Sequence, residues 1–300
     1  MTSFNLQTHA FRFATRGSLL ARAQTQSAIA RVTELPGCSA EEYILETAGD
    51  RDQTSSLAAG DTVGWFTSVL ERALLSGEAS CAVHSAKDLP TDLPDRLGIA
   101  ACLPRGAVED VAVIRNAPSL AALPGGAVVG TSSPRRAAVL SHAYPHLTTA
   151  PIRGNVDTRL RKLEGGDFDA IILARAGLLR LGKESVITEI LDPSIWIPAP
   201  GQGIIAIEAV KETDEWTLLS AASDPTAMLC MQAERAVLRD VGGGCAVPLG
   251  VLATIPEEGM LHIRGGIVQD EGAWVVREVQ GHVESWPILA ASLGEALRSA

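Results

Sequence analysis

The stretch GAVVGTSSPRRAAVL, residues 126–140, contains the strand-to-helix transition that decides the fold. Its apolar run ends at Gly130, Ser133 is well placed to cap a helix, and Pro134 fits the first helical position. The same order, an apolar strand, then polar residues, then a segment of helical period, recurs along the chain as far as about residue 222. This repetition predicts an α/β architecture with mainly parallel sheets.

Two segments interrupt the pattern and are interpreted as crossings between two α/β lobes. They are LPRGAVED, near residue 104, and PAPGQG, near residue 198. After about residue 223 the pattern changes to a long helix, three strands and a final helix, which indicates a small α+β domain. The predicted domains are residues 1–103 with 201–222, residues 104–200, and residues 223–300.

Composition limits the class of function. With 300 residues and 46% hydrophobic side chains, the chain is long enough for two or three globular domains. The net charge of −10 argues against general binding to nucleic acid or to anionic membranes. The N-terminal segment lacks a signal-peptide pattern, and no later stretch reaches the ~18 apolar residues of a membrane span. We therefore predict a cytoplasmic protein.

The five cysteines are scattered, with no CxxC pair, and no histidine or carboxylate cluster has metal-ligand spacing. We therefore expect neither a disulfide framework nor a metal site. Cys245 stands apart because it follows three consecutive glycines in DVGGGCAVPLG, residues 240–250. The local sequence alone leaves two interpretations, a reactive thiol on an open loop or an ordinary loop cysteine.

Basic residues gather where helices are predicted to begin, although the chain as a whole is acidic. Residues 133–180 contain eight Arg or Lys and four acids. A helix N-terminus already carries partial positive charge, so arginines there indicate a site that receives an anion. Carboxylate is favoured over phosphate because the glycine pattern of a phosphate-binding loop is absent. The alternative is a set of solvated helix faces. The candidates are Arg16, Arg135, Arg136, Arg153 and Arg159, with Ser18, Ser133 and Asn155 as helix caps.

One acid directly follows an apolar strand, in CAVHSAKDLPTDLP, residues 81–94. Here Lys87 and Asp88 lie at the carboxyl end of the strand, and Pro90 closes the turn. Asp88 is either an ordinary turn residue or a carboxylate that stabilises positive charge on a ligand held by the arginines. His84 is interpreted as a core residue at the end of the strand.

Together these segments resemble the porphobilinogen deaminase family, also called the hydroxymethylbilane synthases. The resemblance rests on ATRGSLLARAQ, HSAKDLPTDLP, VVGTSSPRR, IRGNVDTRLRKLEGG, PAPGQG and ERAVLRDVGGGCAVPLG, and it covers about residues 11–300. It implies two lobes like those of periplasmic binding proteins and a third, smaller domain. It also implies a monomeric enzyme that joins four porphobilinogen units to a covalently bound dipyrromethane primer and releases hydroxymethylbilane.

The resemblance implies roles for individual residues. Cys245 would carry the dipyrromethane through a thioether, and Asp88 would assist the loss of ammonia and stabilise cationic pyrrole nitrogens. The residues implied to bind the primer are Lys87, Ser133, Arg135, Arg136, Gly154 and Arg159, and those implied to bind substrate are Arg16, Ser18, Arg153, Arg159 and Arg180.

The chain departs from the family pattern in TVGWFTSVLERA, residues 62–73, where Val63 and Ser68 replace two lysines. Arg175 follows the predicted strand DAIILA. It either supplies part of the lost positive charge or is a surface arginine at a helix start. Two alternatives to an active deaminase stay open, a non-catalytic ligand binder and a paralogue that makes a different product.

Overall fold

The computed structural model describes residues 8–46, 68–242, 247–269 and 272–299. The chain divides into two compact units. Unit 1 is Met1–Arg105 with Ile204–Met228, and unit 2 is Gly106–Gly203 with Leu229–Ala300. The chain therefore leaves unit 1 after Arg105 and re-enters it at Ile204. The division into three domains stays a prediction.

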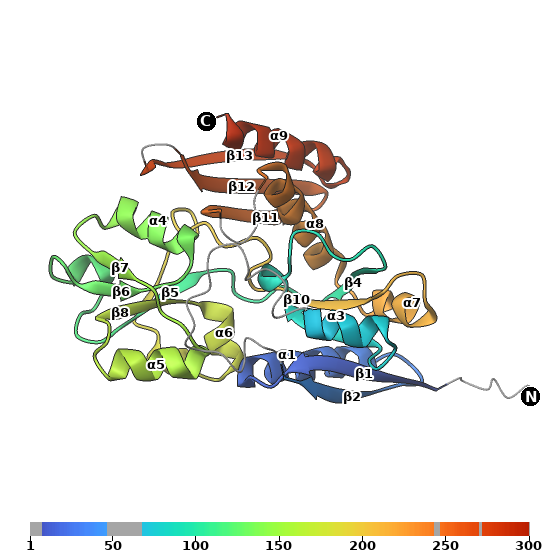
Figure 1. Cartoon of the computed structure of the whole chain (residues 1–300). Helices are drawn as coiled ribbons and strands as arrows, with labels where there is room; N and C mark the ends of the chain where they lie inside the picture. Colours follow the sequence, from blue (N-terminus) through green and yellow to red (C-terminus); the bar gives the residue numbers. More distant parts are fainter. Residues whose placement is uncertain (1–7, 47–67, 243–246, 270–271, 300) are drawn as a thin grey trace, which may run out of the picture. The chain divides into compact units, whose positions relative to one another are not determined.

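Unit 1 is built on a five-stranded sheet of order β2-β1-β3-β10-β4 (Figure 1). β1 pairs in parallel with β2 and β3, whereas β10 is antiparallel to both β3 and β4. The cores show that α1 and α7 cover one face of this sheet and α3 the other. The bounds are β1 His9–Arg16, β2 Cys38–Leu45, β3 Cys81–Ser85, β4 Leu97–Cys102, β10 Ile205–Val210, α1 Leu19–Thr33, α3 Ser68–Leu75 and α7 Asp214–Ala221.

Unit 2 contains a second five-stranded sheet, of order β7-β6-β8-β5-β9, with the same plan. β6 is parallel to β7 and β8, and β5 is antiparallel to β8 and β9. One face packs against α4 and the other against α5 and α6. The bounds are β5 Asp110–Ile114, β6 Val128–Gly130, β7 Thr148–Ala150, β8 Ala170–Ala174, β9 Glu189–Ile190, α4 Pro134–Ala143, α5 Val156–Glu164 and α6 Arg175–Arg180.

The end of the chain forms a three-stranded antiparallel sheet, β11-β12-β13, whose core includes residues of α8 and α9. The predicted α/β class with a small C-terminal sheet domain is confirmed, but the two five-stranded sheets are mixed rather than mainly parallel, because β10 and β5 run antiparallel to their neighbours. The bounds are β11 Leu249–Glu257, β12 Met260–Val268, β13 Trp274–His282, α8 Pro225–Asp240 and α9 Trp286–Arg298. Single 3-10 turns lie at Ala86–Asp88, Leu120–Ala122, Glu184–Val186 and Val283–Ser285.

The helix caps predicted from the sequence are confirmed. The side chains of Ser18, Ser133 and Asn155 each accept a hydrogen bond from the backbone N–H three residues further on, at 3.3, 3.4 and 2.9 Å. Such caps satisfy backbone donors that lack a partner within the first helical turn. They therefore fix where α1, α4 and α5 begin, and with them the arginines beside these helix starts.

Candidate active site

Asp88 lies on the surface of unit 1, at the end of the 3-10 turn that follows β3. Its side chain is exposed, and within the described part of the chain its carboxylate makes no hydrogen bond or ion pair. The preceding Lys87 is half-buried. An exposed carboxylate without a local partner is available to a ligand.

Arg16 and Ser18 lie at the same end of the parallel strands as Lys87 and Asp88. Arg16 is the last residue of β1, and Ser18 caps α1. β1 and β3 are parallel neighbours, so their carboxyl ends lie on one side of the sheet. Unit 1 thus brings together four of the predicted site residues at the kind of edge where α/β proteins bind ligands.

Unit 2 has a corresponding edge. The helices α4, α5 and α6 follow β6, β7 and β8, three neighbouring parallel strands, so their N-termini lie on one side of the sheet. Ser132 joins two of the connecting loops, since its hydroxyl donates to the Ile152 carbonyl at 2.7 Å and accepts from the Ile152 N–H at 3.1 Å.

Arg135 and Arg136 are buried in the first turn of α4, where they share the carboxylate of Asp110. Arg135 Nη2 lies 2.7 Å from Asp110 Oδ2, and Arg136 Nη2 lies 2.6 Å from Oδ1. Asp110 is fully buried and also accepts from Gln202 Nε2 at 3.0 Å. Neither Asp110 nor Gln202 was predicted from the sequence as a site residue. The available signal was a charged residue at the start of the apolar run DVAVI, residues 110–114.

The ionisation of Asp110 depends strongly on the two arginines beside it. Burial alone would raise the pKa of the Asp110 carboxyl, but the positive charges of Arg135 and Arg136 and their hydrogen bonds hold that pKa well below its usual value. Two guanidinium groups against one carboxylate leave one net positive charge in the protein interior. The carboxylate therefore balances only part of the positive charge at the start of α4.

The hydrogen-bond donors of this region suit a ligand that carries several carboxylates, as the implied dipyrromethane primer does. Arg135 Nε is buried and has no hydrogen-bond partner in the described structure, so the cluster keeps an unused donor. Arginine N–H groups at helix N-termini are the usual partners of carboxylates in proteins. On this observation the residues present in unit 2 fit the predicted group.

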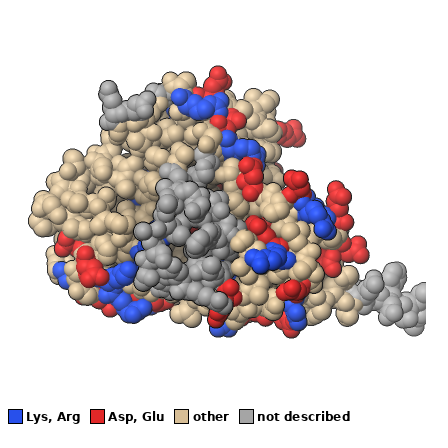
Figure 2. Space-filling model, viewed as in Figure 1, with Lys and Arg blue, Asp and Glu red and all other residues tan. Residues whose placement is uncertain are grey.

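The start of α5 supplies a second basic region. Figure 2 shows basic side chains gathered over α5 on the face drawn. Arg159 Nε donates to the Gly154 carbonyl at 2.8 Å, and the Arg153 side chain is exposed. Gly154 has φ +110°, and a Cβ there would lie 2.6 Å from Thr158 Cγ2, so only glycine fits without rearrangement. The structure therefore places three predicted residues at one helix start.

Arg180 differs from the other candidates because it binds backbone. Its Nη2 donates to the Gly203 carbonyl at 2.6 Å, and that carbonyl also accepts from the Gly106 N–H at 3.1 Å. Desolvation by burial lowers the pKa of the Arg180 guanidinium from its usual value. Arg180 thus helps to hold together Gly106 and Gly203, the first and last residues of the segment 106–203 of unit 2.

Arg175 lies between two carboxylates of unit 2. Its Nη1 is 3.2 Å from Glu109 Oε1, and its Nη2 is 3.5 Å from Glu184 Oε1. A guanidinium whose charge is already balanced by two acids is poorly suited to replace lost lysines. The structure therefore favours the other interpretation, an arginine at a helix start, here the first residue of α6 with its charge used locally. Of the positions that replace lysines, Ser68 is the exposed first residue of α3, and Val63 lies outside the described residues.

The resemblance implies a series of enzyme-bound intermediates, and we expect Arg175→Ala to leave that series unchanged, because the charge of Arg175 is used locally. The free energy of unfolding should fall by no more than about 1 kcal/mol, as for a partly exposed ion pair. Mass spectrometry of the enzyme during turnover and urea unfolding test the two parts. Accumulation of short intermediates would instead support a role in holding the growing chain.

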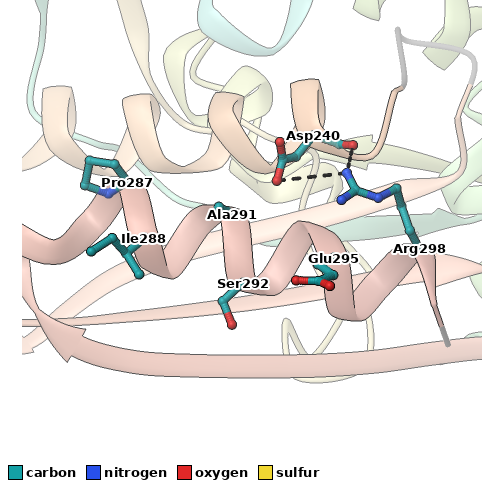
Figure 3. A pocket seen from close by; sticks show the side chains of 7 residues that line it. All are labelled: Asp240, Pro287, Ile288, Ala291, Ser292, Glu295 and Arg298. Atoms are coloured by element: carbon teal, nitrogen blue, oxygen red, sulfur yellow. Dashed lines mark hydrogen bonds and ion pairs between the residues drawn. The ribbon is translucent and has the colours of Figure 1, made fainter.

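A groove of about 540 Å³ lies on unit 2 and is shown in Figure 3. Arg298 makes an ion pair with Asp240, the last residue of α8. None of the predicted site residues lines this groove, so it is not our candidate active site. The lining residues are Asp240, Pro287, Ile288, Ala291, Ser292, Glu295 and Arg298.

Three further points concern a metal site, a membrane span and the predicted attachment cysteine. In the described part of the chain, no group of three or more His, Cys, Asp or Glu is placed to hold a metal ion. Likewise, none of the described helices is long and apolar enough to cross a membrane. Cys245, the predicted attachment residue, lies outside the described residues.

Comparison with known proteins identifies the family. Residues 11–218 match the model described as "Porphobilinogen deaminase, dipyromethane cofactor binding domain", and residues 228–298 match "Porphobilinogen deaminase, C-terminal domain". The probable porphobilinogen deaminase of Methanocella arvoryzae is 47% identical over 81% of this chain and 80% of its own length. The porphobilinogen deaminase of Roseiflexus castenholzii is 45% identical over 94% of this chain and 92% of its own.

Among solved structures, the methionine-binding protein MetQ is 11% identical, with a TM-score of 0.45 over 71% of this chain and 89% of that one. The sequence relatives are far closer and agree with both family models. The chain is therefore a member of the porphobilinogen deaminase family.

Proposed function

We propose that Asp88 is the catalytic carboxylate of this porphobilinogen deaminase. The supporting observation is its position, exposed at the end of β3 and without a partner in the described structure. Porphobilinogen carries two carboxylates and an aminomethyl group, and positive charge develops on its pyrrole ring as ammonia leaves. A fixed carboxylate close to that ring stabilises the charge where it develops.

Arginines and other residues beside the helix starts, with Arg180 at the end of α6, are proposed to hold the carboxylates of substrate and primer. In unit 1 these are Arg16 with Ser18, and Lys87 beside Asp88. In unit 2 the proposed set is Ser133, Arg135, Arg136, Arg153, Gly154, Arg159 and Arg180. Capped helix N-termini and buried guanidinium groups support this set, because both favour negative charge.

The dipyrromethane, when bound, supplies the pyrrole carbon to which the substrate units are added. Cys245 is proposed as its attachment residue. The residues around α4 and α5 would bind its carboxylates and orient it. We further propose that four units are added before release, and that the protein is a cytoplasmic monomer, which cell fractionation and sedimentation would test.

We expect the intact mass of the purified protein to exceed that of the bare chain by one adduct of two pyrrole units on Cys245. Of the four described cysteines, Cys81, Cys102 and Cys230 are buried, and Cys38 is partly so. Burial also raises the pKa of the Cys81 thiol and so disfavours its nucleophilic form. Peptide mapping locates the adduct, and Cys245→Ser should have the bare mass. An adduct on one of the other cysteines would refute the assignment.

Incubation with porphobilinogen tests the function directly. Release of ammonia and a linear tetrapyrrole, identified by mass spectrometry and by absorbance after acid and oxidation, is the expected result. Binding of porphobilinogen without ammonia release would indicate a non-catalytic ligand binder. A product of another length would indicate the altered-product alternative.

A further inference from the structure

His84 in β3 and Glu208 in β10 form a buried polar pair that the proposed function does not use. Glu208 is fully buried, and His84 is 8% exposed. His84 Nε2 and Glu208 Oε2 are 3.0 Å apart, which is hydrogen-bond distance. The second carboxylate oxygen, Oε1, is also buried and has no hydrogen-bond partner among the described residues.

The strand register explains how the two side chains meet. Ala206 lies opposite His84, and Ala82 lies opposite Glu208, so the pair is diagonal across two antiparallel strands. Diagonal neighbours are within reach of long side chains. The pairing of β10 with β4 shifts register between Ile207 and Glu208. The residue without a partner at this shift is Ala100, so the strand that bulges is β4, whereas β10 keeps a regular register with β3 from Ile205 to Ala209.

Stability alone gives no reason for this pair. Burying a carboxylate that has only one partner is unfavourable. A buried ionic pair can often be replaced by apolar side chains of similar volume with no loss of stability. Ala82 and Leu97 lie on the same face of the sheet and belong to an apolar cluster with α3. Burying such a polar pair costs free energy. Its presence therefore indicates that it holds part of the chain in position rather than that it improves packing.

The residues before Asp88 are anchored one after another. His84 contacts Glu208 of β10. Ser85 exchanges two hydrogen bonds with Gln24 of α1, at 2.8 and 3.2 Å. The Ala86 N–H donates to the Ile204 carbonyl at 3.0 Å.

Three consecutive residues are thus held by two parts of unit 1, α1 and the segment of β10 with the residue before it, and Asp88 follows two residues later. Within the described structure the Asp88 carboxylate has no contact of its own that would fix it. The anchored stretch His84–Ala86 therefore contributes to its position, together with the contacts made by Lys87 and Pro90.

We propose that His84 and Glu208 are a positioning pair for Asp88. Glu208 holds His84, and His84 fixes the end of β3 from which the 3-10 turn with Asp88 departs. The inference rests on the proposed catalytic role of Asp88. Loss of the pair displaces the carboxylate relative to the substrate and slows the chemical step, while the carboxylate-binding residues of unit 2 remain in place.

Glu208→Gln tests the proposal, with Ile207→Ala as the matched control. Glutamine keeps the shape of the side chain but removes its charge and leaves a buried amide donor to be satisfied. Ile207 is the fully buried neighbour in the same strand, on the opposite face, so Ile207→Ala removes packing but leaves the pair intact. Both are assayed at a temperature at which circular dichroism shows them folded.

We expect kcat of Glu208→Gln to fall by about tenfold to 100-fold, the size of effect that a small misplacement produces. KM should stay within about twofold, and the intact mass should show full dipyrromethane content, since Arg16 and Ser18 of unit 1 and the carboxylate-binding residues of unit 2 are unchanged. Ile207→Ala should keep kcat within about twofold, whatever its thermal midpoint. A kcat of Glu208→Gln close to that of the unsubstituted chain, or an equal loss in Ile207→Ala, would overturn the proposal.

His84→Gln provides a second route if Glu208→Gln does not fold. It should lower kcat to a similar extent, and the double variant should be little slower than either single variant, because residues that act as a unit are not additive. Additive losses would show that the two side chains act separately and would reject the pair. Failure of the proposed role of Asp88 is distinguishable, because Asp88→Asn would then keep near-normal turnover of porphobilinogen.

Discussion

Asp88→Asn is expected to lower turnover by about 100-fold or more, as for the loss of a group that carries charge or a proton in the transition state. The substitution keeps the size of the side chain. It removes the charge that we propose to stabilise the cationic pyrrole ring. Because Asp88 is exposed and makes no hydrogen bond or ion pair in the described structure, the free energy of unfolding should hardly change. Steady-state kinetics with porphobilinogen and a urea titration measure the two quantities.

Asp95→Asn is the matched control for this experiment. Asp95 is an exposed acid in the segment that follows, so its replacement changes the net charge by the same amount. Turnover of the control should stay near that of the unsubstituted chain. If Asp88→Asn keeps near-normal turnover, the catalytic carboxylate must be sought elsewhere.

Asp110→Asn is expected to destabilise the protein by about 3–5 kcal/mol, the usual cost of breaking a buried ion pair by removing one partner. The neutral amide leaves Arg135 and Arg136 buried beside each other without a balancing charge. Asp157→Asn is a suitable control, because Asp157 pairs with Lys183 near the surface of the same unit and should contribute less than about 1 kcal/mol. Equal effects of the two substitutions in urea unfolding would contradict the importance of the cluster.

The same carboxylate makes stability depend on pH. The pKa of Asp110 is lower in the folded protein than in the unfolded chain, where an aspartate titrates near pH 4. Its contribution to stability is therefore fully present above about pH 4 and is lost as the pH falls from there toward the folded-state pKa. The unsubstituted chain should lose stability over this acid range more steeply than Asp110→Asn.

Local features of the fold were predictable from the sequence. Ser18, Ser133 and Asn155 were identified as helix caps because capping depends on a side chain and a backbone N–H only three residues apart. Asp88 was identified because a charged residue directly after an apolar strand is visible in the sequence. The resemblance to a known family then supplied the chemistry for these positions.

Long-range pairings were not predictable in the same way. Asp110 meets Arg135 across 25 positions, and His84 meets Glu208 across 124. No periodicity links such residues, because their contact depends on the order of strands in a sheet. The antiparallel direction of β5 and β10 was missed for a related reason, since a buried strand reads as a continuous apolar run in either direction.

The place of β10 in the first sheet has a consequence for how the protein is made. β10, residues 205–210, lies between β3 and β4, and among the described strands no other one pairs with β4. On the ribosome, where chains emerge N-terminus first, residues 81–102 appear about 100 residues before the strand that joins them. The sheet of unit 1 therefore stays incomplete, with β3 unpaired on the side that β10 later occupies, until residues 106–203 have been synthesised. β10 then pairs with β3 and β4, which lie more than 100 residues earlier in the chain, and contacts of such long sequence separation slow folding. A nascent chain halted within unit 2 therefore exposes an incomplete sheet.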